Sequence, residues 1–305
     1  MPPIPTVINQ QEKPMRRELR FELARRYAWF WRFKNLQFAE RLFNATNSPC
    51  IVSRPFYGYK LFLDVSRTNA QKLLYLQGER FVAEHYLIAN LVKPNGYVID
   101  VGANIGYYLL MLQSLVGPNG SIVCFEPEPD NLSELRLNIK YNNVNNVELI
   151  ESAVGMTEGT VSFARGINGE VRDDNSGDIL VPMVSLDRAI KRKVDFIKID
   201  VEGYEAHVLI GAENLIKKFR PALFVEIHPR FLTPQYTAED IVAFAASYYQ
   251  NVSFYQAQDQ SNQSAFEKIQ TRYLGKESIK SGNADTFIHN CLSGAAGNVF
   301  WMVCT

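Results

Sequence analysis

Short apolar runs and amphipathic stretches alternate through the middle of the chain, and this alternation is its strongest structural signal. The apolar runs predict strands at 97–101, 121–125, 147–150, 194–199 and 222–227. The amphipathic stretches predict helices at 105–115, 129–141, 204–218 and 237–249. Two more strands are predicted near the C-terminus, at 251–256 and 298–303. Such alternation is typical of an α/β fold, in which helices cover both faces of a parallel sheet.

The N-terminal quarter of the chain follows a different pattern. Residues 1–14 contain four prolines and predict a flexible lead, whereas residues 15–44 repeat apolar side chains at a helical period. Residues 51–65 predict a hairpin that turns near Tyr57 and Gly58, and residues 79–92 predict a helix.

This change of pattern predicts an N-terminal extension over residues 1–77 and a larger domain over residues 78–305. Within the larger domain, the segments near 157–184 and 257–297 lack regular alternation and are expected to be insertions. In the first of them, the irregular stretch 164–178 joins short strands near 160 and 181. Its glycines and charges suit a mobile cover over a ligand site, and a plain surface hairpin fits them equally well.

Composition removes several classes of protein. The 305 residues carry 32 basic and 32 acidic side chains, and this balance gives no support for nucleic-acid binding. The four cysteines are scattered without a C-x-x-C pair, so a structural zinc site is not expected. Free cysteines, the absence of a long apolar run and an N-terminus unlike a signal peptide together predict a cytoplasmic protein.

The predicted N-terminal helix has an unusual charge. Residues 13–41 hold nine basic and three acidic side chains, together with Trp29 and Trp31. A basic, aromatic helix can lie at a membrane surface, so contact through residues 15–44 is one hypothesis. We favour the alternative, in which this helix packs on the larger domain or on a second subunit of a homo-oligomer.

The stretch VIDVGANIGYY predicts a ligand site at the end of the first strand. Asp100 ends the strand, and Gly102 and Gly106 frame a tight turn into the next helix. In open parallel sheets, ligands bind at such strand ends. A dinucleotide site would have the pattern G-x-G-x-x-G, whereas Asn104 places a side chain where a diphosphate requires bare backbone. The turn therefore favours a ligand without a diphosphate.

The second strand ends at Glu126, 20 residues after Gly106. A carboxylate at this point can accept hydrogen bonds from both hydroxyls of a ribose. A ribose without a diphosphate is what S-adenosylmethionine offers, with Asp100 near its methionine end and Ser152 to Val154 beside its adenine. The alternative is a tight turn followed by carboxylates that only cap helices.

Polar side chains also end the next two strands. Asp200 and Glu202 follow the fourth strand, and Glu226 and His228 end the fifth. Strand ends of a parallel sheet share one edge, so these four side chains are expected beside the first site. Removal of a hydroxyl proton requires a carboxylate, a histidine or a metal, and Asp200 and His228 are the predicted bases. The group could also hold Mg²⁺ but does not require it.

Two alternatives apply to these residues. Asp200 and Glu202 would also suit the positive end of the following helix, without any part in catalysis. Glu205 and His207 lie on that helix and are predicted to be surface or packing residues.

Residues 97–229 strongly resemble the FkbM family of S-adenosylmethionine-dependent methyltransferases, through DVGANIGYY, FEPEPDN, SAVG, SLD, KIDVEGYE and VEIHP. The resemblance implies a class I methyltransferase (Rossmann-like) sheet of seven strands, in the order 3-2-1-4-5-7-6 with the last strand antiparallel. It also implies O-methylation of a hydroxyl on a sugar, glycan or other natural product.

The strand-end motifs and the resemblance together predict separate residues for cofactor binding and for catalysis. The cofactor-binding residues would be Asp100, Gly102, Ala103, Asn104, Gly106, Tyr107, Glu126, Pro127, Asn131, Ser152, Ala153 and Val154. The catalytic residues would be Asp200, Glu202, Glu226 and His228. Two other classes stay open at this point: a nicotinamide-dependent oxidoreductase, which would also place Glu126 on a ribose, and a non-catalytic protein with a methyltransferase-like fold.

Overall fold

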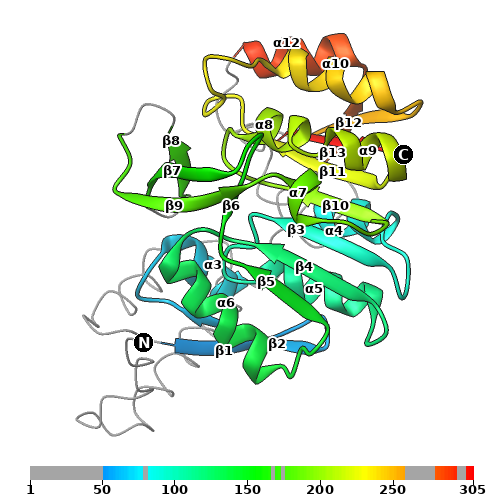
Figure 1. Cartoon of the computed structure of the whole chain (residues 1–305). Helices are drawn as coiled ribbons and strands as arrows, with labels where there is room; N and C mark the ends of the chain where they lie inside the picture. Colours follow the sequence, from blue (N-terminus) through cyan, green and yellow to red (C-terminus); the bar gives the residue numbers. More distant parts are fainter. Residues whose placement is uncertain (1–50, 78–81, 166–168, 173–175, 258–278, 294–299) are drawn as a thin grey trace, which may run out of the picture. The chain divides into compact units, whose positions relative to one another are not determined.

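The computed structural model describes residues 51–77, 82–165, 169–172, 176–257, 279–293 and 300–305 (Figure 1). The predicted lead and basic helix of residues 1–44 lie outside these ranges. The chain divides into two compact units, and the division falls between Arg80 and Phe81. The predicted division into an extension over residues 1–77 and a domain over residues 78–305 stays a prediction.

The first unit contains the predicted hairpin. Strands β1 (Ile51–Phe56) and β2 (Tyr59–Asp64) pair antiparallel, with Phe56 opposite Tyr59. Tyr57 and Gly58 both have positive φ, which is the geometry of a two-residue turn that matches the twist of the strands. Helix α3 (Asn69–Gln77), which the apolar pattern did not predict, packs on both strands.

The second unit is built on a mixed sheet of eight strands. In spatial order they are β13 (Ile279–Gly282), β12 (Val252–Ala257), β14 (Phe300–Cys304), β11 (Ala222–Ile227), β10 (Phe196–Ile199), β3 (Tyr97–Val101), β4 (Ser121–Phe125) and β5 (Val147–Ile150). The last five are mutually parallel, and β14 runs antiparallel to both of its neighbours.

The predicted number of seven strands is therefore wrong. The additional strand β13 pairs with the edge strand β12, inside the segment that was expected to be an irregular insertion. Its pairing depends on an edge that only the folded sheet provides, which explains why weak local periodicity did not predict it. Without β13, the strands numbered along the chain lie as 3-2-1-4-5-7-6.

The helices of this unit follow the predicted alternation with two differences. They are α4 (Val82–Ala89), α5 (Tyr107–Val116), α6 (Pro129–Tyr141), α7 (Leu186–Ala189), α8 (Glu205–Ile210), α9 (Glu213–Phe219), α10 (Ala238–Tyr248) and α12 (Ala284–Leu292). The single helix predicted over 204–218 forms as two helices, which are separated at Gly211. A Cβ on Gly211 would lie 2.0 Å from the carbonyl oxygen of Gly155, so a glycine allows this close approach. Helices α7 and α12 were not predicted, and α12 lies beside α10 (Figure 1).

A second, smaller sheet forms within the predicted insertion at 157–184. Its order is β6 (Ala153–Val154), β9 (Ile179–Val184), β7 (Gly159–Ala164) and β8 (Glu170–Arg172). The predicted strands near 160 and 181 are present, and β8 forms inside the stretch that was expected to be irregular. Because β6 directly follows β5 and Ser152, this sheet begins at the edge of the main sheet where the predicted site lies.

The central strands of the main sheet lie in the hydrophobic core. Every residue of β3 and β10 is buried, as expected for parallel strands covered on both faces. Side-chain caps stabilise the N-termini of two helices. Helix α10 begins with a capping box between Thr237 and Asp240, and Glu128 caps α6 before its first-turn Pro129. None of the helices in the described part of the chain combines the length and apolar character that a membrane crossing requires.

Candidate functional site

The turn after β3 is held tightly between two neighbouring strand ends. Gly102 N and Ala103 N both donate to the carbonyl oxygen of Phe125, at 3.0 Å each. Gly102 has a φ of +79°, and a Cβ on it would lie 1.9 Å from the carbonyl oxygen of Asp200. Only glycine fits this position, since both the backbone conformation and the close approach exclude a side chain.

Glu126 closes the other side of this turn, from the end of β4. Its Oε2 accepts from Asn104 N at 2.7 Å, while its Oε1 accepts from Glu128 N at 2.9 Å and from Asn131 Nδ2 at 3.2 Å. Burial raises the pKa of Glu126 to about 7, although these hydrogen bonds pull it down. Its carboxylate is thus oriented by the protein and still titrates near neutral pH.

A cavity with about 620 Å³ of empty space, counted to its open mouth, lies over these strand ends. Eight of the predicted cofactor residues line it: Gly102, Asn104, Glu126, Pro127, Asn131, Ser152, Ala153 and Val154. Asp200 and Glu202 line it as well, so the cavity reaches both predicted groups of residues.

Other predicted residues are absent from the cavity lining. Ala103, Gly106 and Tyr107 pack around the turn, and Gly106 has a φ of +93° at the start of α5. A Cβ on Gly106 would lie 2.8 Å from Leu135 of α6, so this glycine allows two helices to approach. Their contact with a cofactor stays a prediction.

Asp100 is fully buried beneath the turn and pairs with Lys198 of β10. The Lys198 Nζ lies 3.1 Å from Asp100 Oδ1 and 3.3 Å from Asp200 Oδ2, and it donates to the carbonyl oxygen of Gly102 at 3.2 Å. Lys198 and Asp100 are register partners on adjacent parallel strands, which places both side chains on the same face of the sheet. Burial lowers the pKa of Lys198, but Asp100 and Asp200 outweigh it and raise the pKa above its usual value.

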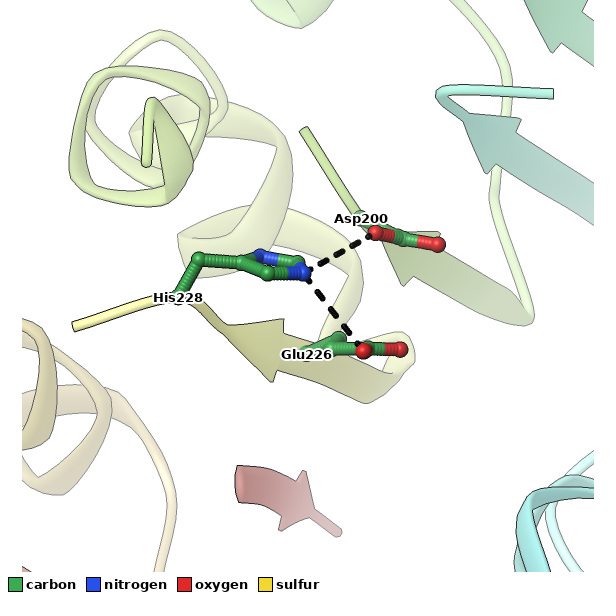
Figure 2. A group of neighbouring side chains, drawn as sticks. All are labelled: Asp200, Glu226 and His228. Carbon is green, nitrogen blue, oxygen red and sulfur yellow. Dashed lines mark ion pairs between the residues drawn. The ribbon is translucent and has the colours of Figure 1, made fainter. Parts of the chain in front are cut away.

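His228 brings the second group together at the ends of β10 and β11. Its Nε2 lies 3.7 Å from Asp200 Oδ1 and 3.5 Å from both Glu202 Oε2 and Glu226 Oε1. Figure 2 shows the Asp200 and Glu226 carboxylates approaching the same ring nitrogen. The four predicted residues therefore converge at His228 Nε2.

The other ring nitrogen of His228 contacts a residue that was predicted to be surface or packing. Glu205, the first residue of α8, is fully buried, and its Oε1 lies 2.7 Å from His228 Nδ1. Of the two predicted roles for Glu205, surface or packing, the surface role is wrong, because α8 packs over β11 and Glu205 is buried. His207 has the expected packing role: it stacks on Tyr204 with ring centroids 3.8 Å apart.

The many carboxylates strongly perturb proton binding in this group. Burial lowers the pKa of His228, but its contacts with Glu205, Glu226 and Asp200 outweigh burial and raise the pKa to about 12. Burial and repulsion from Asp200 and Glu226 raise the pKa of Glu202 to about 7, against the pull of His228. Perturbed values of this kind concentrate at functional sites.

Glu84 of α4 extends the group into the core. It is 2% exposed, accepts a hydrogen bond from the Tyr108 hydroxyl, and has a pKa well above its usual value because of burial and the nearby Glu226. Tyr108 in turn lies under Lys198, whose Nζ is 4.2 Å from the ring centroid. Sequence reasoning missed Glu84 and Lys198. A lysine within the apolar strand FIKI was the one signal that pointed to a buried charge.

The small sheet covers one side of the cavity. Phe163, Gly169 and Val171 line it, so the predicted insertion contributes directly to the pocket. Arg165 joins this sheet to the start of α6 through Glu128, at 3.2 Å, and Asp130, at 2.6 Å. The choice between a mobile cover and a plain surface hairpin stays open.

Comparison with known proteins identifies the central part of the chain. The Methyltransferase FkbM domain matches residues 100–251. Hexuronic acid methyltransferase AglP of Haloferax volcanii is 26% identical over 191 residues, which cover 60% of this chain and 76% of that protein. Methyltransferase sdnD of Sordaria araneosa is 25% identical over 210 residues, which cover 55% of this chain and 78% of that protein.

Among solved structures, the chain is similar to the crystal structure of Methyltransferase FkbM from Methylobacillus flagellatus. It is 17% identical, with a TM-score of 0.44 over 79% of this chain. The chain spans 55% of that protein's length.

Proposed function

Since the chain belongs to the FkbM family of methyltransferases, we propose that its S-adenosylmethionine-dependent methyl transfer goes to a hydroxyl oxygen of a sugar, glycan or other natural product. The observation that carries this proposal is the single cavity lined both by Glu126 with the Gly102 turn and by Asp200 with Glu202. A nucleoside-binding edge and a proton-accepting edge thus share one space.

The residues of the first edge fit a nucleoside without a diphosphate. Oε1 of Glu126 already accepts from two protein donors, whereas Oε2 accepts from Asn104 N and keeps capacity to accept from a ribose hydroxyl. Asn104 lines the cavity at the point where a dinucleotide site requires bare backbone. Ser152 to Val154 provide a small, partly apolar wall for an adenine ring. When bound, S-adenosylmethionine supplies the methyl group.

Lys198 and Asp100 act on this edge from below. We propose that they hold the turn in place and do not touch the cofactor, because Lys198 donates to the Gly102 carbonyl and Asp100 does not line the cavity. A fully buried ion pair with an additional hydrogen bond gives a rigid support, and rigid support is what alignment of the reacting atoms requires.

The second edge removes the acceptor proton. A hydroxyl is a poor nucleophile until its proton leaves, and a carboxylate within hydrogen-bond reach is a suitable base. We assign this role to Asp200 and Glu202, which line the cavity, and the pKa of Glu202, about 7, suits a base near neutral pH. With a pKa of about 12, His228 orients the carboxylates in the free enzyme, as does Glu226 from beneath.

One relative indicates which acceptors to test first. One relative is a hexuronic acid methyltransferase, so hydroxyls of uronic acids and of glycans that contain them are the first acceptors to test. The family membership favours methyl transfer over the nicotinamide-dependent oxidoreductase and over a non-catalytic role.

The experiment has two parts. Isothermal titration of the full-length protein with S-adenosylmethionine and with NAD tests the cofactor, and saturable binding of the first alone is expected. Transfer of a labelled methyl group to a panel of uronic acids, neutral sugars and phenols then tests the acceptor. Binding of NAD alone would contradict the assignment of the cavity, and methylation only of nitrogen or carbon acceptors would contradict O-methylation.

A further inference from the structure

The ring nitrogen His228 Nε2 faces carboxylate oxygens at distances that do not suit hydrogen bonds. The separations of 3.7 Å from Asp200 Oδ1 and 3.5 Å from Glu226 Oε1 exceed the usual range of about 2.7–3.2 Å. All three atoms belong to a group whose members lie within 4.8 Å of one another. An ion bound by all three side chains would suit these distances better than direct hydrogen bonds between them.

These separations match ligands that share a metal ion. With metal–ligand distances of about 2.1 Å, two ligand atoms lie about 3.0 Å apart at a right angle and about 4.2 Å apart when opposite. The distances from His228 Nε2 to Asp200 Oδ1, 3.7 Å, and to Glu226 Oε1, 3.5 Å, fall between these limits (Figure 2). They come from the ends of two adjacent strands, which fixes their backbones.

A second observation independently indicates a metal ligand at His228. Histidines that bind metals nearly always donate their other ring nitrogen to a carboxylate or a carbonyl, which fixes the ring and its tautomer. The fully buried Glu205 does this at Nδ1, at 2.7 Å, and is itself held by the backbone of Gly203 at 3.0 Å. With the Nδ1 proton directed to Glu205, the Nε2 lone pair points toward Asp200 and Glu226.

The charge of the surroundings also favours a cation. Five carboxylates gather here, from Asp100, Asp200, Glu202, Glu205 and Glu226. Lys198 pairs with two of them, and His228 is the other basic group in contact. Buried carboxylates are costly unless paired, and a divalent ion neutralises two of them.

We propose that Asp200, Glu226 and His228 bind a divalent metal ion at the acceptor end of the cavity. Two carboxylates and one imidazole suit Mn²⁺ better than Mg²⁺, which prefers oxygen ligands and retains its waters. A histidine binds a metal through an unprotonated ring nitrogen, and the contact of Nδ1 with Glu205 leaves Nε2 for the ion. The bound ion polarises the acceptor hydroxyl, whose proton passes to Glu202. The oxygen then bonds to the methyl carbon as the carbon–sulfur bond breaks.

This proposal deepens the proposed methyl transfer, but its test does not depend on turnover. Full-length protein treated with EDTA is titrated with Mn²⁺, and free Mn²⁺ is counted by electron paramagnetic resonance. One site per chain is expected, with a ¹⁴N coupling from the His228 imidazole in the pulsed spectrum. Asp200→Asn and Glu226→Gln should each weaken binding at least ~10-fold, and Glu205→Gln, which alters only the support of the ring, ~10–100-fold.

Two controls complete the experiment. Glu239→Gln, at an exposed position on α10, should bind Mn²⁺ like the wild type, and circular dichroism checks that each variant is folded. His228→Ala should lose the ¹⁴N coupling. Absence of a saturable site, or a site with unchanged affinity in Asp200→Asn and His228→Ala, would overturn the proposal. Titration of the metal-free protein with S-adenosylmethionine separates the two claims, because the cofactor edge lacks the proposed ligands.

Discussion

The two edges of the cavity differ in how completely their carboxylates are satisfied. At the nucleoside edge, Glu126 receives three hydrogen bonds of 2.7–3.2 Å from the protein. At the acceptor edge, Asp200, Glu202 and Glu226 face His228 Nε2 at 3.5–3.7 Å, beyond good hydrogen-bond distance. The carboxylate at the first edge is thus oriented by three protein donors, whereas the carboxylates at the second edge face His228 Nε2 without a hydrogen bond to it.

Under the proposed assignment, this difference separates cofactor recognition from chemistry. A site that recognises the same nucleoside in every cycle benefits from rigid groups whose own partners are in place. A site that handles a proton benefits from carboxylates whose proton affinity is close to the working pH. Changes at the acceptor edge should therefore act on turnover, and changes at the nucleoside edge on cofactor affinity.

The largest effect is expected for Asp200→Asn. The substitution keeps the size of the side chain but removes its charge and basicity, so turnover on a true acceptor should fall ~10²–10⁴-fold. Cofactor affinity should change little, and steady-state kinetics with a parallel calorimetric titration separate the two effects. Glu239→Gln is the control at an exposed position. Near-wild-type turnover would place the catalytic group elsewhere.

The next largest effect is expected for Glu126→Gln. Hydrogen bonds to a charged group contribute ~1.5–3 kcal/mol, and the amide also loses an acceptor for the three donors around it. Cofactor affinity should therefore fall ~10-fold or more, with a smaller effect on turnover at saturation. Glu148→Gln, at an exposed acid on β5, should bind normally. Unchanged affinity in Glu126→Gln would remove the ribose assignment.

The pH dependence of cofactor binding should sharpen the same comparison. Ribose hydroxyls donate to the ionised form of Glu126, whose pKa is about 7 in the free protein. Affinity should therefore weaken as pH falls below about 7, by up to ~10-fold per pH unit, and Glu126→Gln should remove that dependence. Calorimetry between about pH 5.5 and 8.5 would measure it, and an identical pH profile in the variant would contradict the prediction.

The stability of the free protein should respond in the opposite direction. The pKa of Glu126 is higher in the folded chain than its ordinary value of 4.5, so the folded state binds this proton more tightly than the unfolded state does. The contribution to stability is fully present below about pH 4.5 and is lost as pH rises through about 7. The difference in thermal unfolding between wild type and Glu126→Gln isolates this contribution from that of Glu202, which shifts in the same direction.

The smallest effect is expected for Arg165→Gln. Its contacts with Glu128 and Asp130 join the small sheet to α6, but the arginine is exposed and such pairs contribute little. Cofactor affinity should fall at most ~5-fold, while hydrogen exchange in β7 and β8 should become faster. A loss of binding as large as that of Glu126→Gln would mean that this sheet, and not the strand ends, dominates recognition.

Much of the fold was predictable because its signals are local. An apolar strand followed by DVGANIG specifies a turn that begins at a buried strand end, and the next strand places Glu126 beside it. The hairpin at Tyr57 and Gly58 was equally local, since two residues with positive φ determine its turn. Helix α12 and strand β13 were not predictable in this way, because they depend on the exposed edge and face that β12 provides.

The sequence by itself determined which residues end each strand, and parallel strand ends must share an edge, so Glu126, Asp200, Glu202, Glu226 and His228 had to lie near one another. Only the tertiary structure decided which of these side chains accept hydrogen bonds from the protein and which face His228 at longer distances. Glu205 has the appearance of a surface residue until α8 packs over β11 and turns it toward His228. Lys198 becomes the buried partner of Asp100 only through the register of β10 against β3. Packing and register are relations between distant segments, and the charge balance of the site depends on them.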